Sequence, residues 1–256
     1  MTSRLVESPR PGACAGIARE ARYLILKQIF TVDLMPAQIE VLNAHRHRHL
    51  KLLRQGQSAH TESVDTMDVM LAEFRPAATA YAIVFIQEQG GIHPQPVLLD
   101  PGRNSNHRKG AWNMHYLPQV LRVHPFTLMM RNGSDDPLIG IDRDSPLISE
   151  TEGEPLFLLD GRLAPTTSEI MSLLARLNEA KRETSEFCRH ISALDWFTPL
   201  GGNGSIYLRI DAARLEQADH TTLHLLRKRG WLTAIYAHLI SLTRFERSNA
   251  HMEEMP

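Results

Sequence analysis

Cysteine is scarce in this chain and neither sign of charge is in excess, and both shortages narrow the classes of protein it can belong to. Only Cys14 and Cys188 occur among 256 residues, which is too few for a disulfide framework or a CxxC metal pair. The 28 lysines and arginines nearly balance the 29 aspartates and glutamates. The net charge therefore gives no overall electrostatic attraction to nucleic acid or to an anionic membrane, and any such binding would need a local patch of basic residues.

Long hydrophobic runs are also missing. The longest, residues 77–86, is interrupted by Thr79 and falls well short of the roughly 20 residues that cross a bilayer. Residues 1–30 contain no apolar run of the roughly 7 to 15 residues that a signal peptide requires. We therefore expect a cytoplasmic protein, in a reducing compartment, with no membrane span.

The common phosphate-binding and nucleophile motifs do not occur. The sequence contains neither GxxxxGK[ST] nor GxSxG, and the glycine-rich stretch GGNGSIYL at 201–208 has Tyr207 where a dinucleotide motif needs its third glycine. These absences argue against nucleotide-binding folds and serine hydrolases. We expect no cofactor.

The part of the chain from 68 to 163 is rich in strand signals, and 43% apolar residues are enough to build a core. Gly90-Gly91, Asn132-Gly133 and Asp160-Gly161 tolerate positive φ, so consecutive runs are expected to pair as antiparallel hairpins. One short helix is expected near 114–123. The five expected strands are 80–87, 95–100, 126–131, 137–142 and 155–160.

From Pro165 onward the apolar period becomes helical. A long amphipathic helix is predicted, and Thr166 with Glu169 has the spacing of a capping box. Its expected stripe is Ile170, Leu173, Leu174, Leu177, Thr184, Phe187, Cys188 and Ile191.

The C-terminal region is predicted to contain a strand or hairpin over 197–210 and two further helices. The first of these helices has Asp219 as N-cap and Gly230 as C-cap. The second covers 231–247, with an apolar stripe at positions 232, 235, 236, 239, 242 and 245.

Together these elements predict an α+β fold, in which an antiparallel β-rich N-terminal half is covered by C-terminal amphipathic helices. We expect an N-terminal extension over 1–34, one domain over 35–248 (β-rich from 68 to 163 and mainly helical from 165 to 248), and a tail over 249–256. The segments around Phe85, Tyr116 and Phe157 are expected to fold together as a single body.

The run AHRHRHL at 44–50 places three histidines at alternate positions. A helix from Pro36, with its stripe at Ile39, Leu42, His45, His49 and Leu53, would put His45 and His49 on one face and His47 on the other. The zinc-protease motif HExxH needs a glutamate where Arg46 stands. Two alternatives stay open, a metal site or a phosphate or RNA contact through Arg46, Arg48, Lys51 and Arg54. We favour a solvated basic face, with no metal and no nucleic acid.

The acidic stretch at 142–154 suggests calcium, because its carboxylates are hard oxygen ligands. An EF-hand loop starting at Asp142 would, however, place Pro146 at its fifth position, Leu147 where glycine is needed, and Gly153 at its bidentate twelfth position. A turn with exposed charge is the better interpretation.

Isolated histidines and aromatic residues offer further candidates. Each histidine could be catalytic, since imidazole titrates near neutrality, but a hydrogen-bonded structural role is the favoured interpretation. Aromatic residues near them could line a pocket, although such spacing is more typical of a core. The histidines are His107, His115, His124 and His238, and the aromatics are Trp112, Tyr116 and Phe126.

Three stretches, 72–87, 111–128 and 141–161, carry a shared pattern. In order, they supply E-F, Y-x-I-V-F, W, Y-x-P, R-x-x-P-F, I-D, S and G-E-P-L-F. This pattern resembles the SapC family of bacterial proteins, and 229–242 resembles the ending of that family, with Tyr236, His238 and Ser241 in register. The resemblance covers about 35–245. It departs at Ala82, where proline is usual, and at His124, where tyrosine is usual.

The resemblance implies a link to bacterial surface-array (S-layer) proteins, because the family is named for a protein encoded beside the secretion genes of one. It brings no established catalytic residue. The positions that it marks as candidate binding residues are Trp112, His115, Tyr116, Arg122, Asp142, Ser145, Glu154, Tyr236 and His238.

Two hypotheses about function follow. The first is an accessory protein that binds a polypeptide, or a surface-protein substrate, during the production or modification of surface proteins. The second is a histidine- or metal-dependent enzyme that modifies a peptide or small molecule, with Trp112, His115, Asp142 and His238 converging on a cleft. Whether the chain is an enzyme stays open at this point.

Overall fold

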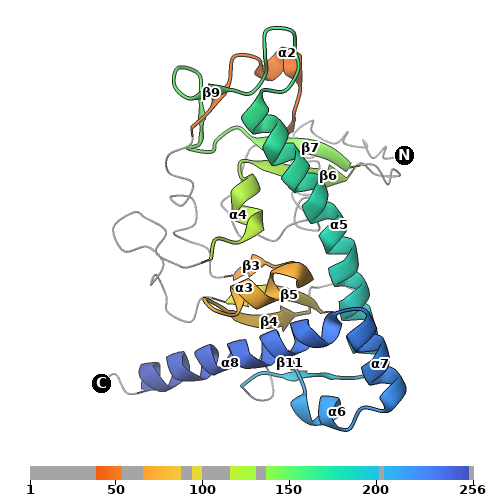
Figure 1. Ribbon diagram of the computed structural model, residues 1–256. Coiled ribbons are helices and arrows are strands. Elements are labelled where there is room, and N and C mark those ends of the chain that lie inside the picture. Colours follow the sequence, from red (N-terminus) through yellow and green to blue (C-terminus); the bar gives the residue numbers. More distant parts are fainter. Residues whose placement is uncertain are drawn as a thin grey trace, which may run out of the picture.

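The computed structural model describes residues 39–53, 66–87, 94–99, 116–130, 137–201 and 205–253. In Figure 1 the helix α5 (Pro165–Ala193) runs along one side of the molecule, from two small sheets to a five-stranded sheet against which α8 (Trp231–Glu253) packs. All of the sheets are antiparallel. The predicted α+β fold, with a β-rich half followed by covering helices, is confirmed. Within the described part of the chain, no helix is both long and apolar enough to span a bilayer.

The five-stranded sheet holds the most buried strand. Its order is β10 (Phe197–Pro199), β11 (Tyr207–Ile210), β4 (Ala82–Ile86), β5 (Gln95–Leu99) and β3 (Thr66–Asp68). The first four residues of β4 are buried, which explains why this strand is a continuous apolar run and does not alternate. The predicted pairing of the runs on either side of Gly90-Gly91 is confirmed, as is the hairpin within 197–210.

Two three-stranded sheets form the other end of the molecule. One has the order β1 (Ile39–Val41), β7 (Pro137–Asp142), β6 (Phe126–Met130), which confirms the predicted hairpin around Asn132-Gly133. The other has the order β8 (Ile148–Ser149), β2 (Lys51–Leu52), β9 (Glu154–Pro155).

The predicted strand at 155–160 is mostly wrong. Only Pro155 of that range is in a strand, and the chain then turns back so that Phe157 bridges Leu163. The strands β1, β2, β3 and β8 were not predicted, because two or three residues are too few to show an alternating pattern.

The short helix predicted from Pro36 is present only as a single turn, which holds His45 and His47 but not His49. Residues 39–53 form β1, the single-turn helix α2 (Ala44–His47) and β2. The expected shared face of His45 and His49 is therefore absent, and His47 is the buried histidine of the three, at 0% exposure.

The helix α5 is present as predicted, but its capping box is not. Pro165 is the first helical residue, the N-cap residue Ala164 has no side-chain cap, and the Thr166 hydroxyl donates to the Glu154 carboxylate instead. A carboxylate from another segment thus replaces the predicted local partner Glu169. The predicted N-cap of α7 (His220–Lys228) is confirmed, since Asp219 accepts from the Thr222 N–H. The C-cap is Arg229 and not Gly230, which follows it with a φ of +74°. Between β11 and α7 lies a short helix that was not predicted, α6 (Ala212–Glu216).

The buried face of α8 differs from the predicted stripe. Position 236 was expected inside, but Tyr236 is 52% exposed, and the polar residues His238 and Ser241 are completely buried. They lie inside because they bond to the backbone of the sheet, as described below. An apolar pattern cannot reveal a buried face of this kind.

Three short helical segments connect the sheets to the helices: η2 (Leu71–Glu73), α3 (Phe74–Ala77) and α4 (Gln119–Val123). The helix predicted at 114–123 is thus present only from 119, and its first two residues lie outside the described residues. Phe85 and Phe157 belong to one core cluster, and Tyr116 packs against it. The expectation that these three segments form a single body is confirmed.

Candidate functional site

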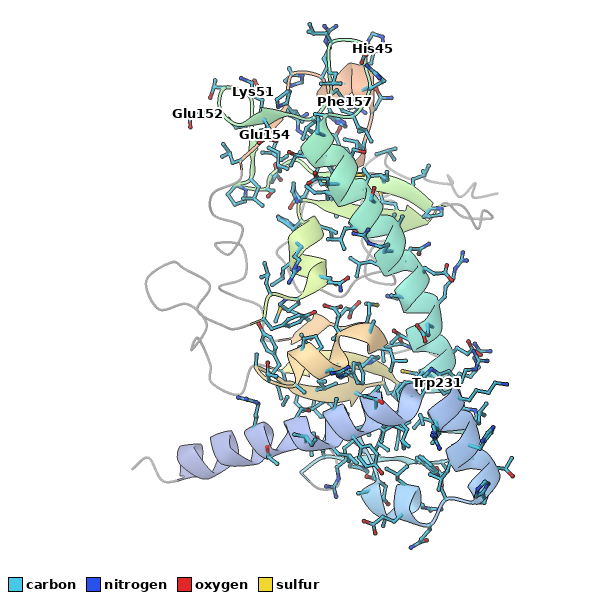
Figure 2. All side chains as sticks on the ribbon, viewed as in Figure 1. His45, Lys51, Glu152, Glu154, Phe157 and Trp231 are labelled. Carbon is cyan, nitrogen blue, oxygen red and sulfur yellow. The ribbon has the colours of Figure 1, made fainter. Side chains whose placement is uncertain are left out.

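The candidate residues belong to elements in several separate parts of the molecule (Figure 1), and Figure 2 labels one of them, Glu154. Tyr116 and Arg122 lie beside η2, whereas Asp142 and Ser145 follow β7. Glu154 is in β9, and Tyr236 and His238 are in α8. Two more candidates, Trp112 and His115, as well as His107, fall outside the described residues. Asp142 ends β7 of a three-stranded sheet, whereas His238 lies on α8 and bonds to the five-stranded sheet, so the described members of the proposed catalytic cleft do not converge.

Glu73 organises the first location. Its carboxylate, 1% exposed, accepts hydrogen bonds from the Tyr116 hydroxyl at 2.5 Å, from the Gln119 N–H at 2.8 Å and from the Met70 N–H at 3.2 Å. Burial raises the pKa of Glu73 above its usual 4.5, although these hydrogen bonds oppose the shift. Burial and the neighbouring Glu73 carboxylate raise the pKa of Tyr116 as well.

Two further side chains complete this cluster. The Tyr81 hydroxyl donates to the Tyr116 carbonyl at 3.2 Å, and the Arg122 guanidinium lies 5.9 Å from the centre of the Tyr116 ring. Arg122 also donates to the Leu117 carbonyl at 3.0 Å. These hydrogen bonds therefore hold the segment at 116–119 against η2. They give a structural reason for three residues of the family pattern, Glu73, Tyr81 and Tyr116.

Ser145 and His124 form a close pair at the second location. The Nε2 atom of His124 is 2.8 Å from the Ser145 hydroxyl, which also accepts from the Leu147 N–H at 3.2 Å. Such a contact resembles a nucleophile and its base. Ser145, however, is only 5% exposed and lies within a tight turn. The nearby Asp142 accepts from the Asp144 N–H at 3.1 Å, and burial raises the pKa of Asp142. We interpret this hydrogen bond as a structural contact that joins the turn after α4 to the turn after β7.

His238 joins α8 to two strands of the large sheet. Its Nε2 atom accepts from the Ile210 N–H at 3.0 Å, so its Nδ1 atom carries the proton and donates to the Ile83 carbonyl at 2.9 Å. The Ser241 hydroxyl accepts from the Ile83 N–H at 2.9 Å. Burial lowers the pKa of His238 to about 4, which keeps the ring neutral. These bonds account for His238 and Ser241 as parts of the core.

Glu154 lies in a tightly packed corner. Its carboxylate accepts from the Thr166 hydroxyl at the start of α5. The preceding Gly153 has a φ of +102°, and a Cβ added there would lie 2.5 Å from the Leu52 carbonyl oxygen. The glycine of the G-E-P-L-F motif is thus at a position where the chain entering β9 approaches β2 too closely for a side chain.

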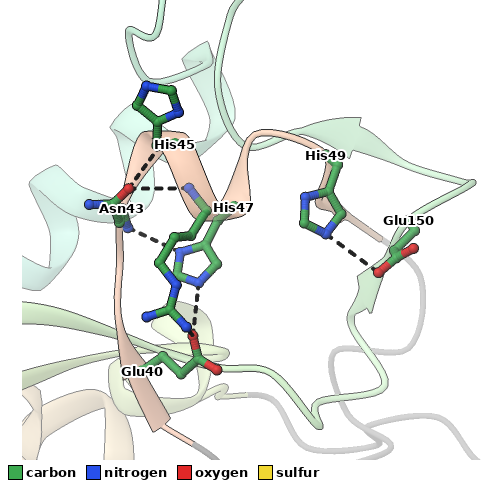
Figure 3. A network of polar contacts seen from close by, with 7 residues as sticks. Glu40, Asn43, His45, His47, His49 and Glu150 are labelled. Atoms are coloured by element: carbon green, nitrogen blue, oxygen red, sulfur yellow. Dashed lines mark hydrogen bonds and ion pairs between the residues drawn. The ribbon is translucent and has the colours of Figure 1, made fainter.

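The histidine run is divided among separate partners (Figure 3). The Asn43 side chain accepts from the backbone N–H groups of His45 and Arg46 and so caps α2. His47 accepts from the Asn43 N–H at its Nδ1 atom, at 3.0 Å, and directs its Nε2 atom to the Glu40 carboxylate at 3.3 Å.

Two further side chains of this run also lie beside carboxylates. Arg46 lies 3.3 Å from the same Glu40 carboxylate, and the Nε2 atom of His49 lies 3.4 Å from Glu150. Among the described residues, no three histidine, cysteine, aspartate or glutamate side chains are grouped to hold a metal ion. Of the basic residues proposed to contact RNA, Arg46 has its charge offset by Glu40.

A recess of about 320 Å³ lies where η2, α3, α5 and the start of α8 meet. Arg229 in this recess is paired with Glu186 at 2.7 Å. Arg75 and Glu183 make no ion pair within the described part of the chain, although both line the recess. No local motif predicts it, because its lining comes from three distant segments: Leu71, Ala72, Arg75, Glu183, Arg229, Gly230, Thr233 and Ala234.

An exposed apolar strip on α8 begins at this recess. Thr233, which lines the recess, is followed on the same helix face by Tyr236 and Ile240. Tyr236 is 52% exposed and Ile240 is 66% exposed. We call these three residues the α8 strip. Beyond it, Arg244 is exposed and donates to the Ala78 carbonyl at 3.2 Å.

Comparison with known protein families gives a match over most of the chain. The family model described as SapC matches residues 42–247, a range that contains the recess and the α8 strip. No curated protein and no solved structure matches the chain.

Proposed function

We propose that this chain, which belongs to the SapC family, is an accessory protein that binds a polypeptide in the production or modification of bacterial surface proteins. The bound segment lies along the α8 strip and carries apolar and acidic side chains. The connection to surface proteins rests on what the family resemblance implies, and the chemistry of the segment rests on the described surface.

The observation that carries the proposal is the exposure of Tyr236 on α8. His238 and Ser241, which belong to the same family pattern, are both buried and hydrogen-bonded to the sheet. Tyr236 has no such packing role, since about half of it is exposed beside the still more exposed Ile240. Two large apolar side chains next to each other on one helix face are typical of a protein-binding surface, and tyrosine is favoured there.

Charge beside the strip selects the partner. Arg75, on α3, lines the recess at one end of the α8 strip. Arg244, on α8, lies beyond the other end of the strip and donates to the Ala78 carbonyl at the end of α3. From Thr233 to Arg244 the helix rises about 16 Å, at about 1.5 Å per residue. An extended polypeptide covers that distance in about five residues. Two acidic residues about five positions apart, with apolar residues between them, would therefore match both the guanidinium groups and the strip.

The described residues give the enzyme hypothesis less support. Of the groups that it names, Asp142 and His238 lie apart, and His238 is held neutral in the core. The Ser145–His124 pair is the one described contact that resembles catalytic geometry, but its hydroxyl is buried within a turn.

Fluorescence anisotropy with synthetic peptides tests the proposal. One labelled dodecapeptide alternates leucine and glutamate, and a second alternates leucine and lysine. We expect the full chain to bind the acidic peptide and not the basic one. The double variant Tyr236→Ser, Ile240→Ser should weaken the binding at least tenfold, because it removes the apolar contact.

Leu159→Ser is the matched control, because Leu159 is fully exposed at the other end of the molecule. This variant should bind the acidic peptide as the wild type does. Equal binding of both peptides, or an unchanged affinity in the double variant, would refute a binding surface on α8.

A further inference from the structure

We infer that the recess between α3, α5 and α8 binds a free α-amino acid with an apolar side chain. The ligand carboxylate binds Arg75, and the ligand ammonium group binds Glu183. This inference concerns a small molecule and does not rest on the proposed polypeptide, although both ligands would use Arg75 and would therefore compete for it.

The two charged side chains on which the inference rests are solvent-exposed and line the same recess. Arg75 is on α3 and Glu183 is on α5, and neither forms an ion pair with the other or with another side chain of the described segments. A single ligand with both a negative and a positive group can neutralise both residues at once. An anion alone would leave Glu183 unpaired, and a cation alone would leave Arg75 unpaired.

The other charged residue of the lining is already neutralised. The Arg229 guanidinium is held by Glu186 at 2.7 Å and lies 5.3 Å from the centre of the Trp231 ring. Arg229 lines one side of the recess. Because Glu186 offsets its charge, Arg229 adds no net charge to that of Arg75 and Glu183. Among the described residues, the recess therefore has one positive and one negative group without an ion-pair partner, which does not suit a phosphate or another multiply charged anion.

The size and the remaining lining select the side chain of the ligand. A volume of about 320 Å³ is at the lower end of the roughly 300 to 1,000 Å³ that ligand pockets cover, so the recess suits an amino acid better than a nucleotide. Leu71, Ala72 and Ala234 supply apolar surface, and Thr233 supplies one hydroxyl. A leucine-sized side chain would bury apolar area against the first three.

Thermal unfolding of the full chain with L-leucine and two analogues tests the inference. 4-Methylpentanoate keeps the carboxylate without the amine, and 3-methylbutylamine keeps the amine without the carboxylate. At a saturating concentration we expect L-leucine to raise the Tm by at least about 3 °C, while neither analogue does so. Ligand-observed NMR then gives the affinities.

Charge-neutral variants assign the contacts. Arg75→Gln and Glu183→Gln should each weaken leucine binding at least tenfold, while Arg182→Gln, a charge change on α5 outside the recess, should not. Glu183→Gln also separates this site from the proposed polypeptide surface, because it should leave binding of the acidic peptide undiminished. Equal binding of 4-methylpentanoate and leucine would overturn the inference, as would the absence of any leucine binding at 10 mM, a concentration about 100 times a Kd of 0.1 mM.

Discussion

The Tyr116 hydroxyl lies 2.5 Å from the Glu73 carboxylate, although the two residues are 43 positions apart in the chain. Glu73 belongs to η2 and Tyr116 leads into α4, so their hydrogen bond fixes one connecting segment to another. The carboxylate is buried and its three hydrogen bonds come from Tyr116, Gln119 and Met70. Loss of one donor would leave part of a buried charge without a partner.

Tyr116→Phe should therefore lower the free energy of unfolding by about 1 to 3 kcal/mol, the cost of leaving a buried acceptor unpaired. Urea unfolding at pH 7 measures the change. Tyr207→Phe is a suitable control, because the Tyr207 hydroxyl has no partner among the described residues. The double variant Glu73→Gln, Tyr116→Phe should lose less than the sum of the two single variants, and strict additivity would show that the two groups do not interact.

His238 should make stability depend on pH. Its pKa in the folded protein is lowered to about 4 from an ordinary 6.5, so between these values the unfolded chain binds a proton that the folded chain does not. Stability should therefore be complete above about pH 6.5 and fall by up to about 3 kcal/mol as the pH decreases toward 4. Urea unfolding of the wild type and of His238→Gln at pH 5 and pH 7 measures this dependence. If the two proteins respond equally to pH, His238 is not the group responsible.

Two glycines with positive φ should differ in their tolerance of alanine. A Cβ at Gly153 would lie 2.5 Å from the Leu52 carbonyl oxygen, whereas a Cβ at Gly161, with a φ of +82°, would meet nothing within 4 Å. Gly161→Ala should cost only the backbone strain, about 1 kcal/mol, and Gly153→Ala should cost at least about 2 kcal/mol more. Thermal unfolding compares them. Similar losses in both variants would mean that the Leu52 contact relaxes without cost.

The three histidines of the 44–50 run should respond differently to alanine substitution. His47 is completely buried and makes two polar contacts, whereas His45 and His49 are exposed. His47→Ala should therefore cost about 2 to 4 kcal/mol, and the other two substitutions should stay within about 0.5 kcal/mol. Elemental analysis of tag-free protein accompanies the unfolding curves. A bound metal lost on substitution of His45 or His49 would contradict the structural role assigned here.

Several elements could be predicted because their information is local. The apolar run of β4 and the turn that follows it sufficed for the β4–β5 hairpin, and Asp219 with Gly230 marked the two ends of α7. The short strand β2 and the capping of α5 could not be predicted. The β2 strand depends on partners about 100 residues away, and Thr166 bonds to Glu154 in preference to its own helix.

The sequence by itself determined the α+β fold, the main hairpins, the long helix and the family, because hydrophobic period, turn residues and motif order are read from neighbouring positions. Only the tertiary structure decided which face of α8 is buried and which residues meet in the recess. His238 and Ser241 turn inward because backbone groups of the sheet need hydrogen-bond partners, and this leaves Tyr236 in solvent. Arg75 and Glu183 are more than 100 positions apart, and only the packing of the helices brings them to one recess.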